Sequence, residues 1–158
     1  MRGNAQVVAQ LNMALKEELT AINQYFIHAE MCHNWGYDRL GGYIRKQSID
    51  EMKHAEALIE RLLFLDAVPK MEAMELTVGQ DVRAQLEADL KLETNAVAMY
   101  NKAIQVSRDQ GDDVSRELFS TLLKDEELHV DWLEAQMHQI KEMGYEQYLS
   151  NQTEGSKD

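Results

Sequence analysis

Apolar residues recur every three or four positions in four long stretches of the chain. This spacing places them on one face of an α-helix, which has about 3.6 residues per turn. The sequence therefore predicts four amphipathic helices, which span about Ala5 to Asn34, Asp38 to Leu65, Gly79 to Asp109, and Asp112 or Asp113 to Gly144. A short helix is expected over about Tyr145 to Leu149, followed by a frayed tail over residues 151–158.

The connections between these helices are unequal. A few residues separate the first helix from the second and the third from the fourth, so each pair is expected to be antiparallel. The connection from Asp66 to Thr77 is longer, and its twelve residues span roughly 40 Å when extended. A helix of roughly 27 residues has about the same length. The expected fold is all-α: one domain over residues 1–158, a four-helix bundle with one long crossover loop and a short C-terminal helix.

Composition narrows the class of protein. The net charge is −12, from 28 acidic and 16 basic residues, and no basic stripe is visible, so no nucleic-acid partner is expected. No apolar run is long enough to cross a membrane, and the N-terminus has no apolar signal core, so we expect no membrane association and a cytoplasmic location. Cys32 is the only cysteine, which excludes an intrachain disulfide.

Two copies of Glu-x-x-His occur at equivalent places in the two halves of the chain. They are Glu51–His54 and Glu126–His129, and they lie 75 residues apart. Residues three apart share a helix face, so each copy can hold one metal ion. Glu18 and Glu93 interrupt the apolar stripes of the first and third helices at the same offset of 75 residues. The chain is therefore interpreted as two related helical hairpins.

These four glutamates lie near the midpoints of their helices, so they can meet the two histidines inside the bundle. Unpaired buried carboxylates repel one another and take up protons. Two divalent cations would balance the charge of four carboxylates, and oxygen and imidazole donors without thiolates favour iron or manganese over structural zinc. The alternative is a polar cluster without metal, since a single Glu-x-x-His is common on solvated helices.

Three runs of the sequence resemble bacterioferritin: Glu18–Phe26, Ser48–Ala55 and Asp131–Glu134. The similarity covers nearly the whole chain except the tail. It implies a ferritin-like bundle that oxidises Fe²⁺ with O₂ or H₂O₂ and stores ferric mineral in a 24-subunit cage built from dimers. It also implies a ferredoxin-type reductant for iron release. By this resemblance each subunit binds two irons, with Glu18 and Glu93 as terminal ligands, Glu51 and Glu126 as bridging ligands, and His54 and His129 on one iron each.

Met52 points about 100° away from Glu51 around its helix and so leaves the metal face. The resemblance implies that Met52 is a haem axial ligand, with haem b shared between two subunits across a two-fold axis. The alternative is a methionine-rich dimer contact. Many bacterioferritins have histidine where this chain has Lys46, so an extra inner-surface iron site is in doubt. Asp50 is then expected to accept a hydrogen bond from a ligand histidine.

Two other functions stay open. One is a di-iron oxygenase or peroxidase, and the other is a haem-binding electron carrier with an inactive metal core; hydrodynamic size would separate both from a cage. Tyr25 is the best candidate for a redox relay because it lies two turns from Glu18, although packing is the expected role of the aromatic residues. The remaining histidines are expected to be ordinary polar residues without partners: His28, His33 and His138.

Overall fold

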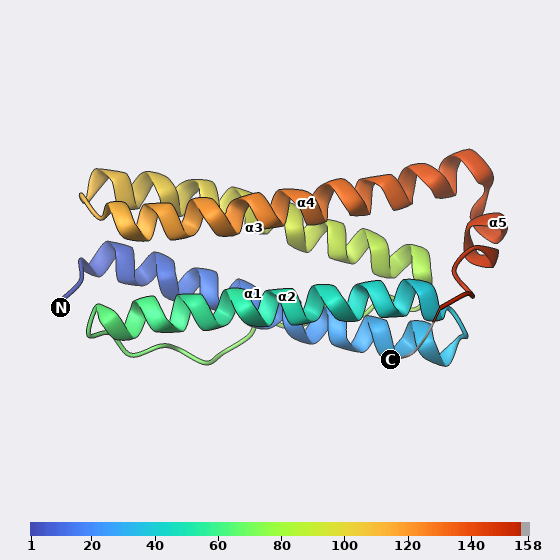
Figure 1. Ribbon diagram of the computed structural model, residues 1–158, viewed down its shortest axis with the longest axis horizontal. Helices are drawn as coiled ribbons and strands as arrows, with labels where there is room; N and C mark the ends of the chain where they lie inside the picture. Colours follow the sequence, from blue (N-terminus) through green and yellow to red (C-terminus); the bar gives the residue numbers. More distant parts are fainter. Residues whose placement is uncertain (156–158) are drawn as a thin grey trace.

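The chain folds into a bundle of four long helices with a short fifth helix across one end (Figure 1). The computed structural model describes residues 1–155. The all-α fold expected from the apolar periodicity is confirmed. The helices are α1 (Ala5–Asn34), α2 (Asp38–Phe64), α3 (Val82–Asp109), α4 (Asp113–Met143) and α5 (Tyr145–Ser150).

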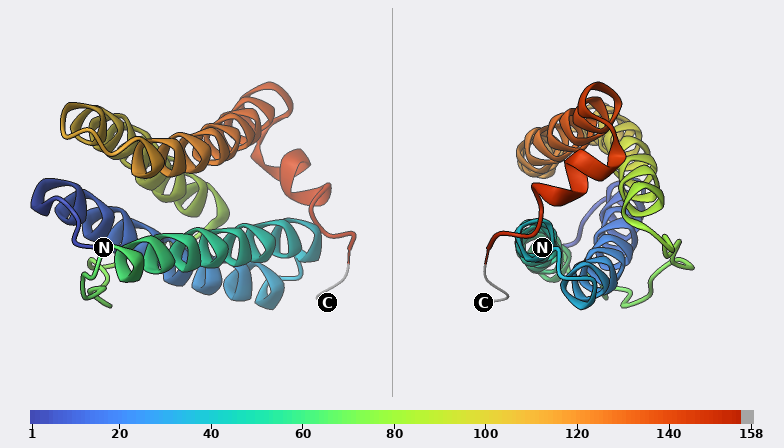
Figure 2. Two further views of the ribbon diagram at one scale, coloured as in Figure 1. Left: turned by 60° about the vertical axis from the view of Figure 1, so that its left-hand side comes forward. Right: turned by 90° about the vertical axis from the view of Figure 1, so that its right-hand side faces the viewer.

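The long helices form two antiparallel hairpins, α1–α2 and α3–α4, which lie one above the other (Figures 1 and 2). Both α2 and α3 begin at the end of the bundle that carries α5, so they run parallel (Figure 1). Residues 65–81 connect them and travel the length of the bundle. The predicted one-crossover topology is therefore confirmed. Helix α1 packs against α2 and α3, whereas α2 and α4 touch each other little.

The crossover segment is held to α1 by polar side chains of that helix. Four backbone N–H groups of the segment donate to acceptors that follow one side of α1, three of them spaced four residues apart. An extended segment with no strand partner would otherwise leave these donors to water. The bonds run from Lys70 to Asn12 (2.9 Å), Met74 to Thr20 (2.9 Å), Thr77 to Gln24 (3.2 Å) and Gly79 to His28 (3.0 Å).

Helix α3 begins at Val82, three residues later than the sequence predicts. Asp81 caps it by accepting a hydrogen bond from the Ala84 N–H at 2.8 Å. Gly79 belongs to the crossover segment because its N–H is bound to α1. A Cβ atom on Gly79 would also lie 2.3 Å from the backbone nitrogen of Gln85, so only glycine fits this approach.

The fourth helix is capped by Asp112, one of the two residues expected there, whose side chain accepts from the Ser115 N–H at 3.0 Å. The chain then turns at Gly144 and forms α5. The first residues after α5 are held to the bundle, although the sequence predicted a frayed tail there. Gln152 is buried, and its carbonyl accepts a hydrogen bond from the Arg39 N–H at 3.0 Å. The rest of the expected frayed tail, residues 156–158, lies outside the described residues.

Two apolar clusters fill the bundle on either side of its mid-height. Along each long helix, polar residues separate the members of one cluster from the members of the other. The bundle therefore contains a buried polar layer between two apolar halves. The first cluster includes Val7, Leu11, Leu15, Leu58, Leu62, Tyr100 and Phe119, and the second includes Tyr25, Leu40, Ile44, Leu86, Leu133, Ile140 and Tyr148.

A buried histidine–aspartate pair lies next to this polar layer. His28 Nδ1 is 2.9 Å from Asp89 Oδ1, and Gln24 Nε2 donates to the same oxygen at 2.9 Å. Because His28 Nε2 accepts the Gly79 N–H, the ring proton resides on Nδ1 and is donated to Asp89. His28 is therefore not the ordinary polar residue that the sequence suggested, and neither is His33, whose Nδ1 lies 2.8 Å from Oδ1 of Asp38.

Replacing His28 with alanine is expected to destabilise the fold by about 3 kcal/mol, because the buried Asp89 loses a donor and the Gly79 N–H loses its acceptor. For a chain of this size, that loss lowers Tm by roughly 6–12 °C. Differential scanning calorimetry measures the change. His138→Ala, at an exposed position of α4, is the matched control and should shift Tm by no more than about 2 °C. Equal Tm values for both variants would contradict a stabilising role of the pair.

Candidate metal centre

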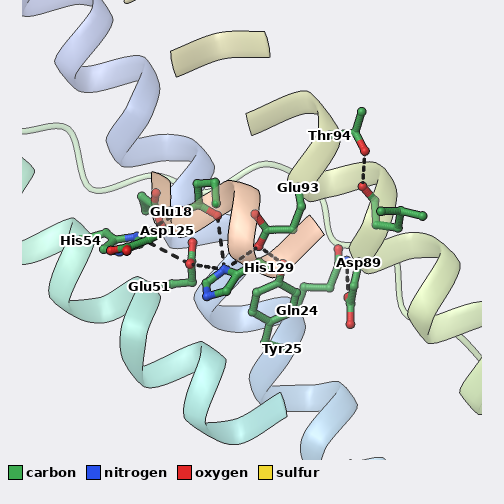
Figure 3. A network of polar contacts seen from close by, with 12 residues as sticks. Glu18, Gln24, Tyr25, Glu51, His54, Asp89, Glu93, Thr94, Asp125 and His129 are labelled. Carbon is green, nitrogen blue, oxygen red and sulfur yellow. Dashed lines mark hydrogen bonds and ion pairs between the residues drawn. The ribbon is translucent and has the colours of Figure 1, made fainter. Parts of the chain in front are cut away.

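Six donor side chains from four helices converge in the buried polar layer. Figure 3 labels all of them except Glu126. Each long helix contributes one glutamate, and α2 and α4 each add a histidine one turn after it. The glutamates are at most 1% exposed and the histidines at most 7%. The structure thus brings together all six residues that the sequence pattern singled out, which are Glu18, Glu51, His54, Glu93, Glu126 and His129.

The donor atoms divide into two groups, and within each group they all lie within 4.8 Å of one another. Glu51 and Glu126 belong to both groups, so their carboxylates stand between the two halves of the cluster. This arrangement can hold two cations that share two carboxylates. The first group is Glu18, Glu51, His54 and Glu126, and the second is Glu51, Glu93, Glu126 and His129.

Each histidine faces several carboxylates through its Nδ1 atom. His54 Nδ1 lies 3.1 Å from Glu126 Oε1 and 3.5 Å from Glu18 Oε2. His129 Nδ1 lies 3.1 Å from Glu51 Oε1 and 3.4 Å from Glu126 Oε2. Burial lowers the pKa of both rings, but hydrogen bonding with the carboxylates outweighs it and raises the pKa of His54 to about 11 and of His129 to about 10. Protonated imidazoles therefore neutralise part of the cluster when no metal does.

The glutamates are incompletely partnered. Each of Glu18, Glu51, Glu93 and Glu126 has one buried oxygen that makes no hydrogen bond of good geometry in the described part of the chain, although in all but Glu93 this oxygen lies 3.1–3.5 Å from a histidine Nδ1. Burial, followed by repulsion among the carboxylates, raises the pKa of Glu18, Glu51 and Glu93. Burial acts the same way on Glu126, but hydrogen bonds from Glu93 and the histidines hold its pKa well below the usual range. A cation in each half would supply the partner that these oxygens lack.

Two buried tyrosines orient the outer glutamates. The Tyr25 hydroxyl on α1 donates to Glu93 Oε1, as Figure 3 shows. The Tyr100 hydroxyl on α3 donates to Glu18 Oε1 at 2.5 Å. Each tyrosine thus reaches the glutamate of the other hairpin. Tyr25, the candidate redox relay, thus contacts Glu93 on α3 and not Glu18, which lies two turns away on its own helix. Burial and the nearby carboxylates raise the pKa of both hydroxyls well above the usual value, so both remain donors.

The outer nitrogen of His54 also has an acidic partner. His54 Nε2 lies 2.9 Å from Oδ2 of Asp125 on α4 (Figure 3). Such an outer carboxylate fixes the orientation of a histidine ring whose other nitrogen faces a metal. The sequence predicted Asp50 in this role for one of the two histidines, but within residues 1–155 Asp50 makes no hydrogen bond or ion pair with either of them. That prediction is wrong, and the two halves of the cluster differ here.

Met52 does not join the cluster. Its side chain is 58% exposed on the outer side of α2, as the helical geometry predicts. Ile49, one turn earlier, is 46% exposed, and Phe26 on α1 is 59% exposed. The Ser48 hydroxyl donates to the Ile22 carbonyl at 2.8 Å, which sets α1 and α2 side by side at this level. Three large apolar side chains therefore face solvent on one hairpin.

No helix within residues 1–155 combines the length and apolar character that crossing a bilayer requires.

Comparison with known proteins agrees with this architecture. Residues 8–143 match the family model for the ferritin-like domain. The chain is 42% identical over 149 residues to the bacterioferritin of Mycolicibacterium paratuberculosis, which covers 94% of each chain. It is 43% identical to the bacterioferritin of Brucella melitensis biotype 1, covering 94% of this chain and 92% of that protein. Likewise, it is 41% identical to the bacterioferritin of Streptomyces coelicolor, covering 95% and 90%. With similarity this high over nearly its whole length, the chain belongs to the bacterioferritins, within the ferritin-like proteins.

Proposed function

We propose that this protein oxidises ferrous ions at the buried cluster and stores the ferric product. The observation that carries the proposal is the pair of half-sites that share Glu51 and Glu126. Membership of the bacterioferritin family supports iron as the metal, and the oxygen and imidazole donors suit Fe²⁺. The single, buried Cys32 is in line with a reducing cytoplasmic location.

Each residue of the cluster has a proposed place around two ferrous ions. Glu18 and His54 would bind one ion, Glu93 and His129 would bind the other, and Glu51 and Glu126 would bridge them. Two divalent cations balance four carboxylates, so the buried cluster would carry no net charge. The unpartnered oxygen on every glutamate supports this assignment, because each is free to bind a cation.

The proposed reaction transfers one electron from each ferrous ion to O₂ or H₂O₂. With peroxide, two electrons and two protons yield two water molecules while two Fe²⁺ become two Fe³⁺. Carboxylates favour the product because the attraction grows with the charge of the cation. Tyr25 and Tyr100 hold the outer glutamates in position during this change, and Asp125 holds His54.

A combined assay of rate and size tests this proposal. Purified protein is expected to oxidise ferrous ion faster than buffer alone, and the ferric product should elute with the protein as a large assembly, proposed as a 24-subunit cage built from dimers. Gel filtration with iron detection measures both. Ferric product that precipitates, or protein that elutes only as a dimer, would contradict storage and favour a di-iron oxygenase or a haem-binding electron carrier.

We also propose that haem b binds across a two-fold axis between subunits, with one Met52 from each side. The exposed apolar side chains of Met52, Ile49 and Phe26 support this, because such a patch is favourably covered by an apolar ligand or partner. Met52 of each subunit would hold the haem, because a two-fold axis would bring the two side chains together. Haem held there would supply a one-electron centre, which a ferredoxin-type reductant could use for iron release.

Met52→Leu is expected to remove haem and leave ferrous oxidation unchanged, because Met52 lies outside the six-residue cluster. Leucine keeps the apolar volume but has no thioether sulfur. The haem absorbance per subunit of the purified variant measures the loss. Met13→Leu, at another exposed methionine, serves as control and should keep its haem. Haem content equal to that of the parent protein would refute the role of Met52.

A further inference from the structure

A pocket of about 370 Å³ opens between α2 and α4, directly over His54 and His129. Most of its wall comes from one face of α2, where residues recur at helical spacing. The proposed oxidation gives no role to the other polar groups of this wall. The polar side chains of this wall that could bind a ligand are Lys46, Gln47, Asp50 and Lys53.

Gln47 is the most unusual of these groups. Its side chain is 2% exposed, and neither Oε1 nor Nε2 makes a hydrogen bond of good geometry in the described part of the chain, although the Tyr43 hydroxyl on the same wall is close enough to interact with the amide. A buried amide left unpaired is costly, so polar side chains in protein interiors nearly always find partners. Gln47 lines the pocket, but its amide atoms are covered, so the side chain would have to turn before an occupant could accept from Nε2 and donate to Oε1.

Lys46 and Lys53 stand on the same wall, two helical turns apart. Both are exposed, and neither forms an ion pair within 4.0 Å with another of residues 1–155. Asp50 lies between them on this face and forms no ion pair either. The pocket therefore presents two ammonium groups and one amide as donors, together with a carboxylate and an amide oxygen as acceptors.

This mixture of groups selects among ligands. Two lysines repel a divalent cation, whereas Asp50 repels an anion that carries no proton. An oxyanion that keeps a proton satisfies both, since its oxygens accept from the lysines and from Gln47 Nε2 while its hydroxyl donates to Asp50. We propose that the pocket binds inorganic phosphate in its protonated forms.

The binding itself does not depend on whether the cluster holds iron. The effect of bound phosphate on ferric iron, however, rests on the proposed function. The pocket opens onto His54 and His129, so phosphate held there is the first anion that a ferric ion meets outside the cluster.

Calorimetric titration of the assembled, mineral-free protein with inorganic phosphate, and separately with sulfate, tests the proposal. Near neutral pH, phosphate should saturate at about one per subunit. Sulfate, which has no proton to donate, should bind about tenfold more weakly or less. Lys46→Met and Lys53→Met should each weaken phosphate binding by about tenfold, because each removes a charged donor. Lys102→Met, at an exposed lysine of α3, should change nothing.

Asp50→Asn gives the sharper test. An amide can donate to sulfate and no longer repels it, so the preference for phosphate over sulfate should fall to near one. Absence of saturable phosphate binding, equal affinity of all three lysine variants, or a preference that survives Asp50→Asn would each overturn the proposal. Any of these results would refute phosphate binding without affecting ferrous oxidation. Conversely, a parent protein that does not oxidise ferrous ion would refute the proposed function without affecting phosphate binding.

Discussion

Replacing Glu126 with alanine is expected to slow rapid ferrous oxidation by at least about 100-fold, because this carboxylate belongs to both half-sites. The truncation removes a donor from each half at once. The fold should survive, since the truncation leaves untouched the two apolar clusters on either side of the polar layer. The two histidines lose a charge partner, but they can release their protons. Stopped-flow absorbance of the ferric product measures the rate, and gel filtration checks assembly.

The neighbouring residue offers a matched control. Glu127 follows Glu126 on α4 but is exposed, so Glu127→Ala should oxidise iron at the rate of the parent protein. Glu126→Gln retains the shape of the side chain and removes its charge, and it should also be slow. Glu18→Ala should be slow as well, through loss of one half-site. A Glu126→Ala protein as fast as the parent would show that the cluster does not bind the reacting iron.

Ferrous ion added without oxygen is expected to raise Tm and to release protons. The metal-free cluster keeps protons on both histidines and on the glutamates whose pKa burial raises. Metal ligands must be deprotonated, so cations displace these protons. Metal that binds only the folded state stabilises it by about 4 kcal/mol at roughly 1,000 times Kd. For a chain of this size, that raises Tm by roughly 8–16 °C.

The same protons set the pH dependence of the metal-free protein. Its stability should fall as pH rises from about 6.5 to about 10, because folded His54 and His129, with pKa values of about 11 and about 10, keep protons that the unfolded chain has lost. The raised glutamate pKa values act in the same direction, beginning near the usual glutamate pKa of 4.5. The lowered pKa of Glu126 opposes them only in the acidic range. When metal replaces these protons, the stability of the protein should depend less on pH.

Anaerobic calorimetric titration in two buffers of different ionisation enthalpy counts the released protons. Saturation near two metals per subunit, with heat that depends on the buffer, is the expected result. Melting scans of both forms between about pH 7 and pH 9 measure the slope. Weak binding without saturation and without buffer dependence would instead describe solvated glutamates, and it would contradict the buried centre.

The positions of the helices, their inward faces and the level at which the six donors lie could all be predicted from the sequence. The apolar stripes predicted α1 and α2 to within a residue, because helix periodicity is a local property of the chain. The shared offset of 75 residues indicated which glutamates occupy equivalent places in the two hairpins. The length of the connection between α2 and α3 was enough to predict the crossover, since only a parallel arrangement needs so long a link.

The side-chain contacts between helices could not be predicted from the sequence, because they depend on how the helices pack. Tyr25 reaches Glu93 and not Glu18, Asp125 and not Asp50 serves His54, and His28 pairs with Asp89. These partners lie on different helices, so their meeting depends on the rotation and axial offset of one helix against another. Packing over the whole interface sets those two quantities, together with the crossover segment bound along α1. No local spacing in the sequence encodes them, which is why two related hairpins acquired different contacts around one centre.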